Sequence, residues 1–261
     1  MAPHPYLDAP LPLAMAHRGG ATYGPNRGIE NTVPAFATAV DLGYRYLETD
    51  VRASRDGVPV VVHDDRLGRL CGAPVRVCDL DWHELSRLRV GGREPLPRLD
   101  DVLATFAELR LNIDVKSDDA ALPTLAALRS AGAAHRICLA SFSDRRMRRM
   151  RRLAGPALAT SLATGEVALL RLGPLAAVRA VAARGGGVAA QVPLRSRGVT
   201  VANAALVRYA HELGLQVHVW GVNDVATMHA LLDLGVDGLI ADRLDLLVDV
   251  LRDRRATRSV S

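Results

Sequence analysis

The chain has 261 residues, of which 49% are hydrophobic, so it can bury a substantial core and is not intrinsically disordered. Its net charge is +5. Aromatic residues are only 4% and no nucleic-acid-binding motif is present, so we expect no nucleic-acid partner. No apolar run reaches the ~20 residues that cross a bilayer, and we therefore expect no transmembrane segment.

The N-terminus and the cysteines indicate the compartment. Residues 1–12 have no basic segment followed by a long apolar run, and prolines interrupt them, so they do not resemble a signal peptide. The three cysteines, Cys71, Cys78 and Cys138, are odd in number and lack metal-ligand spacing, which favours free thiols in a reducing compartment. The sequence therefore predicts a cytoplasmic protein with an N-terminal extension over residues 1–12.

In the first half of the chain, short apolar strands alternate with helical patterns. Asn31 or Thr32 can cap a first helix that ends at residue 42. Asp56-Gly57 predicts a tight turn between the second and third strands. Residues 66–97 are loop-rich, with one short helix at 82–88. The strands are predicted at 13–17, 46–51, 58–63 and 111–115, and a further helix at 100–109.

The second half repeats the same unit more regularly. Helices are predicted at 123–130, 144–153, 174–183, 204–213, 224–234 and 244–252. Strands are predicted at 137–142, 158–163, 188–192, 216–222 and 238–241. Residues 253–261 are charged, then small and polar, and are predicted to be a disordered tail.

This alternation predicts parallel strands with helical crossovers, and over this length a TIM (β/α)₈ barrel. We expect one domain over residues 13–252, with a small excursion near 66–97. Nine strands are predicted, and the surplus one is expected within 46–63, where the connection is too short for a crossover helix. A doubly wound open sheet is the alternative, although it usually has a glycine fingerprint after its first strand.

Chemically active residues gather at the ends of predicted strands. His17 and Arg18 follow the first strand, and His63 closes the third. Glu48 and Asp50 share one strand face, as do Asp114 and Lys116. Converging carboxylates repel one another unless they are protonated or a cation bridges them, and oxygen ligands favour Mg²⁺ or Ca²⁺.

Basic groups and histidines complete this set. Arg18 and Lys116 would supply positive charge to a phosphate. Two histidines suit acid–base chemistry near neutral pH, in which one removes a proton and the other donates one. Together the residues have the means to hydrolyse a phosphodiester.

Most of these residues lie in segments that resemble the glycerophosphodiester phosphodiesterase family, a group of TIM-barrel phosphodiesterases that also resemble phosphatidylinositol phospholipase C. The segments follow the family's order over roughly residues 13 to 245. They are His17-Arg18-Gly19, Glu30-Asn31-Thr32, Glu48-x-Asp50-Val51, Asp56-Gly57-x-Pro59-Val60-Val61-x-His63-Asp64, the stretch 96–103, Ser141-Phe142, Val219-Trp220-x-Val222-Asn223 and the stretch 236–240.

The resemblance implies an enzyme that cleaves glycerophosphodiesters into glycerol 3-phosphate and an alcohol. It implies an acid–base pair of His17 and His63. It places the metal on Glu48, Asp50 and Asp114, and the phosphate on Arg18 and Lys116. Glu30 would lie beside the metal site and support a catalytic histidine.

Three further residues at strand ends are candidates for the pocket. Trp220 can form an apolar wall for the glycerol backbone, whereas His218, deeper on the same face, is interpreted as a packed residue of the barrel interior. Gln191 and Phe142 are expected to line the pocket.

Two departures from the family pattern concern the site. Asp114 stands where the family usually has a longer glutamate, and residues 24–29 lengthen the loop before Glu30. The alternative activities are lysophospholipase D-type hydrolysis at the same site and, as a non-enzyme, a barrel that binds phosphorylated ligands. Direct attack by water and a cyclic phosphate intermediate are both open, as is the oligomeric state.

The run of arginines over 145–152 is interpreted as an amphipathic barrel helix, because Met147, Met150 and Leu153 share one face. Transient contact of its arginines with an anionic membrane surface is the alternative.

Overall fold

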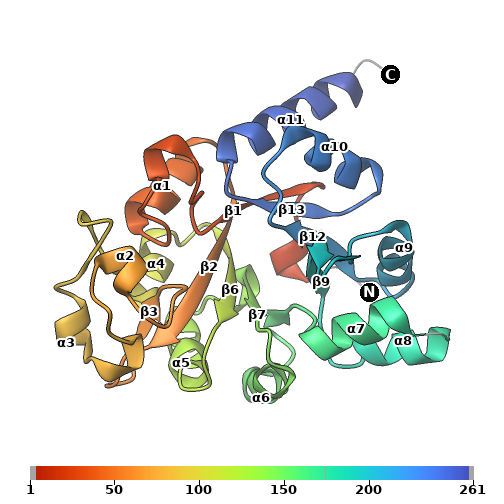
Figure 1. The fold of residues 1–261 in the computed structure, drawn as a ribbon. Coiled ribbons are helices and arrows are strands. Elements are labelled where there is room, and N and C mark those ends of the chain that lie inside the picture. Colours follow the sequence, from red (N-terminus) through yellow and green to blue (C-terminus); the bar gives the residue numbers. More distant parts are fainter. Residues whose placement is uncertain (1–3, 174, 259–261) are drawn as a thin grey trace.

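The computed structural model describes residues 4–173 and 175–258, and in this part of the chain eight parallel strands form a barrel (Figure 1). Between β8 and β9 the pairing reduces to one parallel bridge, Ser161 with Ala189. The predicted TIM barrel is therefore confirmed. The strands, in spatial order, are β8 (Ala159–Thr160), β7 (Ile137–Ala140), β6 (Arg110–Val115), β2 (Tyr46–Ala53), β1 (Leu13–His17), β13 (Gly238–Ala241), β12 (Gln216–Trp220) and β9 (Ala189–Pro193).

Helices cover the outside of this barrel (Figure 1). Helix α6 shows why, since Met147 and Met150 are fully buried while Arg148 and Arg152 are exposed. The main helices are α1 (Val33–Asp41), α4 (Leu99–Thr105), α5 (Ala121–Ser130), α6 (Asp144–Ala154), α7 (Thr164–Leu172), α8 (Ala176–Ala183), α9 (Ala204–Glu212), α10 (Val225–Asp233) and α11 (Leu244–Arg258), with a short 3-10 turn η4 (Ala134–Arg136) before β7.

The surplus strand lies where the sequence predicts it. Strand β3 (Pro59–Val61) pairs antiparallel with the end of β2 and lies outside the barrel order. The chain then makes the predicted excursion, whose small core includes Val60, Leu67 and Leu85. This excursion consists of α2 (Gly68–Cys71), η3 (Val77–Asp79), α3 (Trp82–Leu85), β4 (Arg89–Val90) and β5 (Glu94–Pro95).

Helix α7 was not predicted, because Thr164-Gly165 has the composition of a loop. Side chains satisfy the backbone of its first turn instead: Ala163 N donates to Glu166 Oε2 (2.8 Å) and Gly165 N donates to Asp144 Oδ1 (3.0 Å). The short hairpin of β10 (Arg195–Ser196) and β11 (Val199–Thr200) was also missed.

Helix α11 continues to Arg258, beyond its predicted end at residue 252, so most of the predicted disordered tail is helical. Arg254 donates to Asp233 Oδ1 of α10 (2.7 Å), which holds this part of α11 against its neighbour. Residues 259–261 of the predicted tail lie outside the described part of the chain. Helix α4 ends at Thr105, four residues before its predicted end.

The predicted N-terminal extension covers the end of the barrel at which the strands begin. Its turn η1 (Pro5–Leu7) buries Tyr6 completely, and the Tyr6 ring meets the Tyr46 ring edge-to-face at 5.3 Å between centroids. Tyr46 Oη also donates to the Tyr6 carbonyl oxygen (2.6 Å). The active groups must therefore use the other end, where the strands finish.

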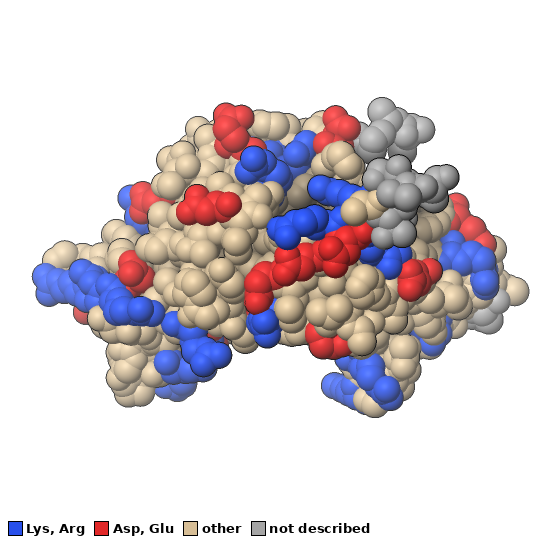
Figure 2. All heavy atoms as spheres, turned by 90° about the horizontal axis from the view of Figure 1, so that it is seen from above, with Lys and Arg blue, Asp and Glu red and all other residues tan. Residues whose placement is uncertain are grey.

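Charge on the face seen from above is mixed, with basic and acidic side chains lying side by side (Figure 2). Helix α11 contributes ion pairs of this kind, such as Arg252 with Asp249 at 3.0 Å. This face offers no continuous basic field. No helix in the described part of the chain is long and apolar enough to cross a membrane.

His218 is a fully buried residue of the barrel interior, as the sequence predicts, and contacts Gln216 Oε1 (2.9 Å) through Nε2. Burial lowers the pKa of His218 to about 4. The unfolded chain therefore binds a proton at higher pH than the folded chain, and stability falls as pH decreases from the unfolded value of ~6.5 towards 4.

We expect this protonation to cost on the order of 3 kcal/mol of unfolding free energy between pH 7 and 4, and the variant His218→Gln to lack that part of the acid loss. Urea denaturation at both pH values measures it, with the exposed His135→Gln as control. Equal acid losses in wild type and His218→Gln would contradict the prediction.

Candidate active site

The predicted site residues meet at the end of the barrel where the strands finish. His17 is the last residue of β1 and pairs in register with Glu48 of β2, while Asp50 pairs with Asp114 of β6. The chain leaves β1 through Gly19 and Gly20, both at positive φ, and a Cβ at Gly20 would collide with Leu244. Register alone therefore brings the predicted residues of three strands together.

Lysine and arginine neutralise the two aspartates. Lys116 Nζ lies between them, 2.8 Å from Asp50 Oδ1 and 2.7 Å from Asp114 Oδ2. Arg18 Nε lies 3.0 Å from Asp50 Oδ2. Asp50 is 1% exposed and Asp114 6%, so these are ion pairs in a site that largely excludes water.

Burial and neighbouring charge set the protonation of this cluster. Burial opposes ionisation of Asp50, but Lys116 and Arg18 outweigh it and lower the Asp50 pKa. Burial and the adjacent Asp50 raise the pKa of Glu48 to about 7, and burial also raises the Asp114 pKa. The cluster thus holds more carboxylate than its own cations fully neutralise.

A strained backbone supports the cluster. Arg18 has φ 51° and Asn31 has φ 60°, in the left-handed region that residues other than glycine rarely adopt. Hydrogen bonds of the Asn31 side chain offset this backbone strain: Nδ2 donates to Asp50 Oδ2 (3.0 Å) and Oδ1 accepts from Thr49 (2.8 Å). Asn31 therefore helps to orient the Asp50 carboxylate.

His17 is oriented by a residue that the sequence analysis missed. Its Nδ1 lies 2.7 Å from Asp242 Oδ1, and its Nε2 lies 3.7 Å from Glu48 Oε2. Asn223 holds the carboxylate, donating from Nδ2 to Asp242 Oδ2 (2.9 Å). Burial alone would lower the His17 pKa, but Glu48 and Asp242 outweigh burial and raise it.

A signal for Asp242 was present in the sequence. It directly follows the strand predicted at 238–241, in the same position at a strand end as the other polar candidates. Asn223 belongs to a quoted family segment but was given no role.

His63 lies outside the barrel strands, just after β3. Its Nδ1 is 2.8 Å from Asp64 Oδ1, and its carbonyl oxygen accepts a hydrogen bond from Arg52 Nε (2.8 Å). Burial alone would raise the Asp64 pKa, but Arg69 and His63 together outweigh burial and lower that pKa to about 2. Each predicted catalytic histidine thus has an acidic partner on Nδ1, which leaves Nε2 for chemistry.

Glu30 links the two sides of the site. It accepts a hydrogen bond from Arg18 (3.1 Å) and two from Arg69 (2.8 Å each). Through Arg18 it lies next to the carboxylate cluster, and its side-chain contacts are with arginines and not directly with a histidine; its place beside a metal stays a prediction.

The lengthened loop before Glu30 packs against the excursion. It forms the turn η2 (Gly24–Asn26), and Arg27 accepts a hydrogen bond at its carbonyl oxygen from Arg93 (3.2 Å). Asn26 also donates to the carbonyls of Gly19 (2.7 Å) and Ala35 (3.1 Å). The loop therefore fixes the path from His17 to Glu30.

Two of the three predicted pocket residues lie at the rim. Phe142 is 63% exposed and meets Trp220 edge-to-face at 6.2 Å between ring centroids. Lys116 Nζ lies 5.5 Å from the centre of the Phe142 ring. Gln191 is half-buried, donates to Asn112 Oδ1 (3.0 Å) and faces His218.

The predicted metal ligands are close together, but Lys116 occupies the space between two of them. Within residues 4–173 and 175–258, no three His, Cys, Asp or Glu side chains are already arranged around a common metal position. The donor set nevertheless suits a hard cation, because Asp114 Oδ1 is buried and accepts no hydrogen bond from the described residues.

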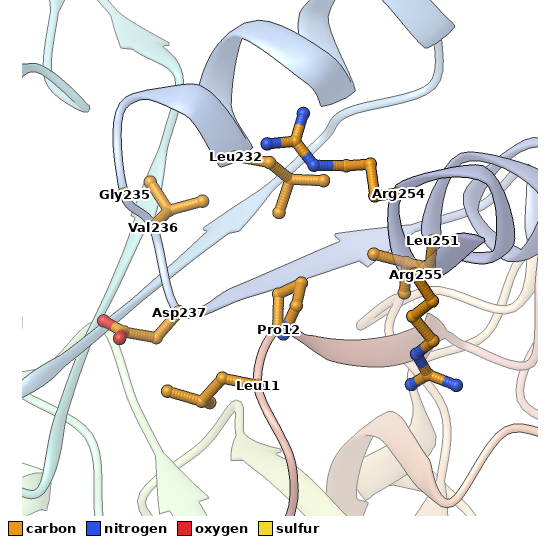
Figure 3. Close-up of a pocket in the computed structure, with 9 residues that line it drawn as sticks. All are labelled: Leu11, Pro12, Leu232, Gly235, Val236, Asp237, Leu251, Arg254 and Arg255. Atoms are coloured by element: carbon orange, nitrogen blue, oxygen red, sulfur yellow. The ribbon is translucent and has the colours of Figure 1, made fainter. Parts of the chain in front are cut away.

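A pocket of 220 Å³ lies at the opposite end of the barrel, between α10, α11 and the segment before β1 (Figure 3). Leu11, Asp237 and Arg254 are among the residues that line it. None of the predicted site residues does, so this pocket is separate from the catalytic end.

Fold and site define a class of protein: a TIM barrel whose mouth combines buried carboxylates, an arginine and a lysine paired with them, and two carboxylate-paired histidines. Comparison with known proteins agrees. Residues 17–246 match the model of the "Glycerophosphoryl diester phosphodiesterase family". The chain therefore belongs to this family and is a phosphoric diester hydrolase.

Individual relatives cover nearly the whole chain. The "Probable glycerophosphodiester phosphodiesterase 2" of Mycobacterium tuberculosis is 43% identical over 92% of this chain and 90% of its own length. A crystal structure of a "Putative glycerophosphoryl diester phosphodiesterase" from Silicibacter pomeroyi superposes with a TM-score of 0.79 at 27% identity, covering 95% of both chains. An Oleispira antarctica phosphodiesterase, solved with sn-glycerol-3-phosphate, shares the fold at 19% identity (TM-score 0.74; 93% of this chain, 97% of that one).

The His17–Asp242 hydrogen bond makes a specific prediction for turnover of a glycerophosphodiester. In Asp242→Asn an amide replaces the carboxylate that fixes the imidazole, so we expect kcat to fall by about a hundredfold or more with little change in KM. Steady-state kinetics measures both constants. Asp245→Asn, which breaks only the Arg243 pair, is the control and should keep wild-type kcat. An unchanged kcat in Asp242→Asn would contradict the role of this bond.

Proposed function

We propose that the chain hydrolyses glycerophosphodiesters to glycerol 3-phosphate and an alcohol, with His17 and His63 as an acid–base pair. The observation that carries this proposal is that both histidines present a carboxylate-bound Nδ1, at 2.7 and 2.8 Å, beside a cluster of buried ions at the barrel mouth. Arrangements of this kind hold a histidine in one tautomer and orientation.

In this mechanism the two histidines move protons on opposite sides of the phosphorus. One Nε2 accepts a proton from the attacking hydroxyl as the new P–O bond forms. The other imidazole, protonated, gives its proton to the oxygen of the leaving alcohol as the old P–O bond breaks, so no free alkoxide is released. The attacking hydroxyl is that of water or of the neighbouring glycerol carbon.

Charged side chains would hold the phosphate between the histidines. Arg18 is always protonated, and although burial opposes the charge on Lys116, Asp50 and Asp114 outweigh burial and raise its pKa. Both side chains therefore carry a positive charge that would attract a phosphate oxygen, while each also pairs with Asp50. Without these two cations, the buried carboxylates would repel a negatively charged diester, and its binding would be strongly unfavourable.

Glu48, Asp50 and Asp114 would hold a divalent cation, Mg²⁺ or Ca²⁺. The buried Asp114 Oδ1 without a hydrogen-bond donor among the described residues, and the raised pKa of Glu48, both support a cation at this cluster. When bound, such an ion would polarise the phosphoryl group and stabilise charge on its oxygens. Asp114 is shorter than the glutamate usual in the family, and it is held at present by Lys116.

The aromatic rim would receive the organic parts of the substrate. Trp220 and the exposed Phe142 offer an apolar edge beside Lys116, which suits a glycerol backbone next to its phosphate. The same edge extends to solvent and favours a second candidate substrate, lysophospholipids, whose acyl chain would lie on it. Turnover of lysophospholipids by the wild type, reduced in Phe142→Ser, would support that candidate.

We also propose that the protein is cytoplasmic and contacts anionic membrane surfaces transiently. The three cysteines are free, which supports a reducing, cytoplasmic compartment. The exposed Arg148 and Arg152 of α6 support transient contact with anionic lipid headgroups.

The acid–base pair predicts that His17→Ala and His63→Ala each lower kcat on a glycerophosphocholine-type diester by at least ~10²-fold, because each removes one proton transfer. Thermal unfolding should show that both variants remain folded. His211→Ala is a matched control, since it breaks another His–Asp pair, with Asp237 at 2.8 Å, away from the mouth. Normal turnover by the two mouth variants would exclude the mechanism.

The carboxylate cluster predicts metal dependence. Treatment with a chelator should reduce turnover, and Mg²⁺ or Ca²⁺ should restore it. Independently of activity, added cation should raise the Tm of the wild type, because it binds the folded state, and should do so less in Glu48→Gln. Full activity in chelator together with an unchanged Tm would rule out the metal.

A further inference from the structure

We propose that Arg69 is a positioning residue that holds the catalytic His63 and the phosphate-binding Arg18 in place at the same time; this inference rests on the proposed function. Arg69 belongs to α2 of the excursion, and its side-chain hydrogen bonds are to Asp64 and Glu30. It acts through two carboxylates, Asp64 and Glu30.

The Arg69 guanidinium forms a bidentate pair with each of two carboxylates. Its Nε donates to Asp64 Oδ2 (2.8 Å) and one terminal nitrogen donates to Asp64 Oδ1 (3.0 Å). Its two terminal nitrogens also donate to the two oxygens of Glu30, both at 2.8 Å. Each carboxylate is thus gripped in bidentate fashion, which only a planar guanidinium can do for both at once.

Each carboxylate is shared with one residue of the site. Asp64 Oδ1, which binds Arg69, also binds His63 Nδ1 (2.8 Å). Glu30 Oε1, which binds Arg69, also accepts from Arg18 (3.1 Å). The result is one ionic chain, His63–Asp64–Arg69–Glu30–Arg18, that joins the excursion to the loop after β1.

The backbone around these groups is held by other contacts, so removing the Arg69 side chain should not displace the loops. Arg52 Nε binds the His63 carbonyl oxygen, and Val62 N donates to the Asp50 carbonyl oxygen (2.9 Å). Leu70, the next residue after Arg69, is buried, and its carbonyl oxygen accepts from Gly91 N (2.8 Å). Arg69 therefore controls the orientation of the His63 and Arg18 side chains, through Asp64 and Glu30.

The two arms predict different kinetic effects, which simple destabilisation would not produce. Loss of the Asp64 arm frees the His63 ring and should lower kcat. Loss of the Glu30 arm leaves Arg18 held by Asp50 at Nε but loosens Glu30, the partner of its terminal nitrogen, and should raise KM. We expect Arg69→Met to do both, with kcat/KM reduced by about 10²-fold, and Arg69→Lys to recover only part of it, because an ammonium cannot fork to both carboxylates.

Double-mutant cycles test the proposal. In an Asp64→Asn background, Arg69→Met should lower kcat by less than about threefold further, because the arm through Asp64 is already broken. Arg76→Met is the matched control: Arg76 forms an exposed ion pair with Asp65 (3.0 Å) in the same excursion, and its loss should leave kcat and KM within about twofold of wild type. Full additivity of the Arg69 and Asp64 effects on kcat would overturn the proposal.

A measurement without substrate separates this inference from the proposed function. Nitrogen NMR of the His63 ring should show the Nδ1–H tautomer in the wild type and Arg76→Met, and a mixture of tautomers in Arg69→Met. If the wild type turns over no diester, the proposed function fails. The His63 ring-nitrogen spectrum then still tests whether Arg69 orients His63. An unchanged tautomer in Arg69→Met would overturn the Arg69 proposal.

Discussion

Three carboxylates are buried side by side at the mouth of this barrel, and the rest of the site follows from the need to compensate them. Glu48, Asp50 and Asp114 are each at most 7% exposed. Burying such charges is unfavourable unless cations lie against them, and Lys116 and Arg18 do so at 2.7–3.0 Å. The strained backbone conformation of Arg18 places its guanidinium against Asp50, and this ion pair offsets the strain.

The two histidines reach this cluster from different parts of the chain. His17 ends a barrel strand and is oriented by Asp242, which follows the last strand. His63 belongs to the excursion and is oriented by its neighbour Asp64. Closing the barrel therefore places one histidine, and docking the excursion on the loop before Glu30 places the other. A reaction that needs both couples catalysis to the packing between these two units.

The sequence was sufficient for the features that depend on local pattern. Strand–helix alternation predicted the barrel, and polar residues at strand ends predicted which side chains would converge. The short connection within residues 46–63 confined the surplus strand to that pair, and the structure shows that it is β3. Phe142 and Trp220, which the same argument proposed for the pocket, meet edge-to-face in the structure, and their contact with substrate stays a prediction.

What the sequence did not reveal depends on tertiary contacts. Arg69 has no periodic or motif position that marks it, and its importance appears only when Glu30 and Asp64 are seen on its two sides. Helix α7 begins at Thr164-Gly165, where distant Asp144 supplies the missing hydrogen bond. The partners of Gln191 also depend on register, which places it beside His218 and within reach of Asn112.

The most direct test of the account is the identity of the products, followed by phosphorus NMR. With a glycerophosphocholine-type diester, the account predicts that the wild type forms glycerol 3-phosphate and the free alcohol, because the P–O bond to the alcohol breaks. His17→Ala should form neither. Release of free glycerol together with a phosphorylated alcohol, or identical product formation by His17→Ala, would contradict it.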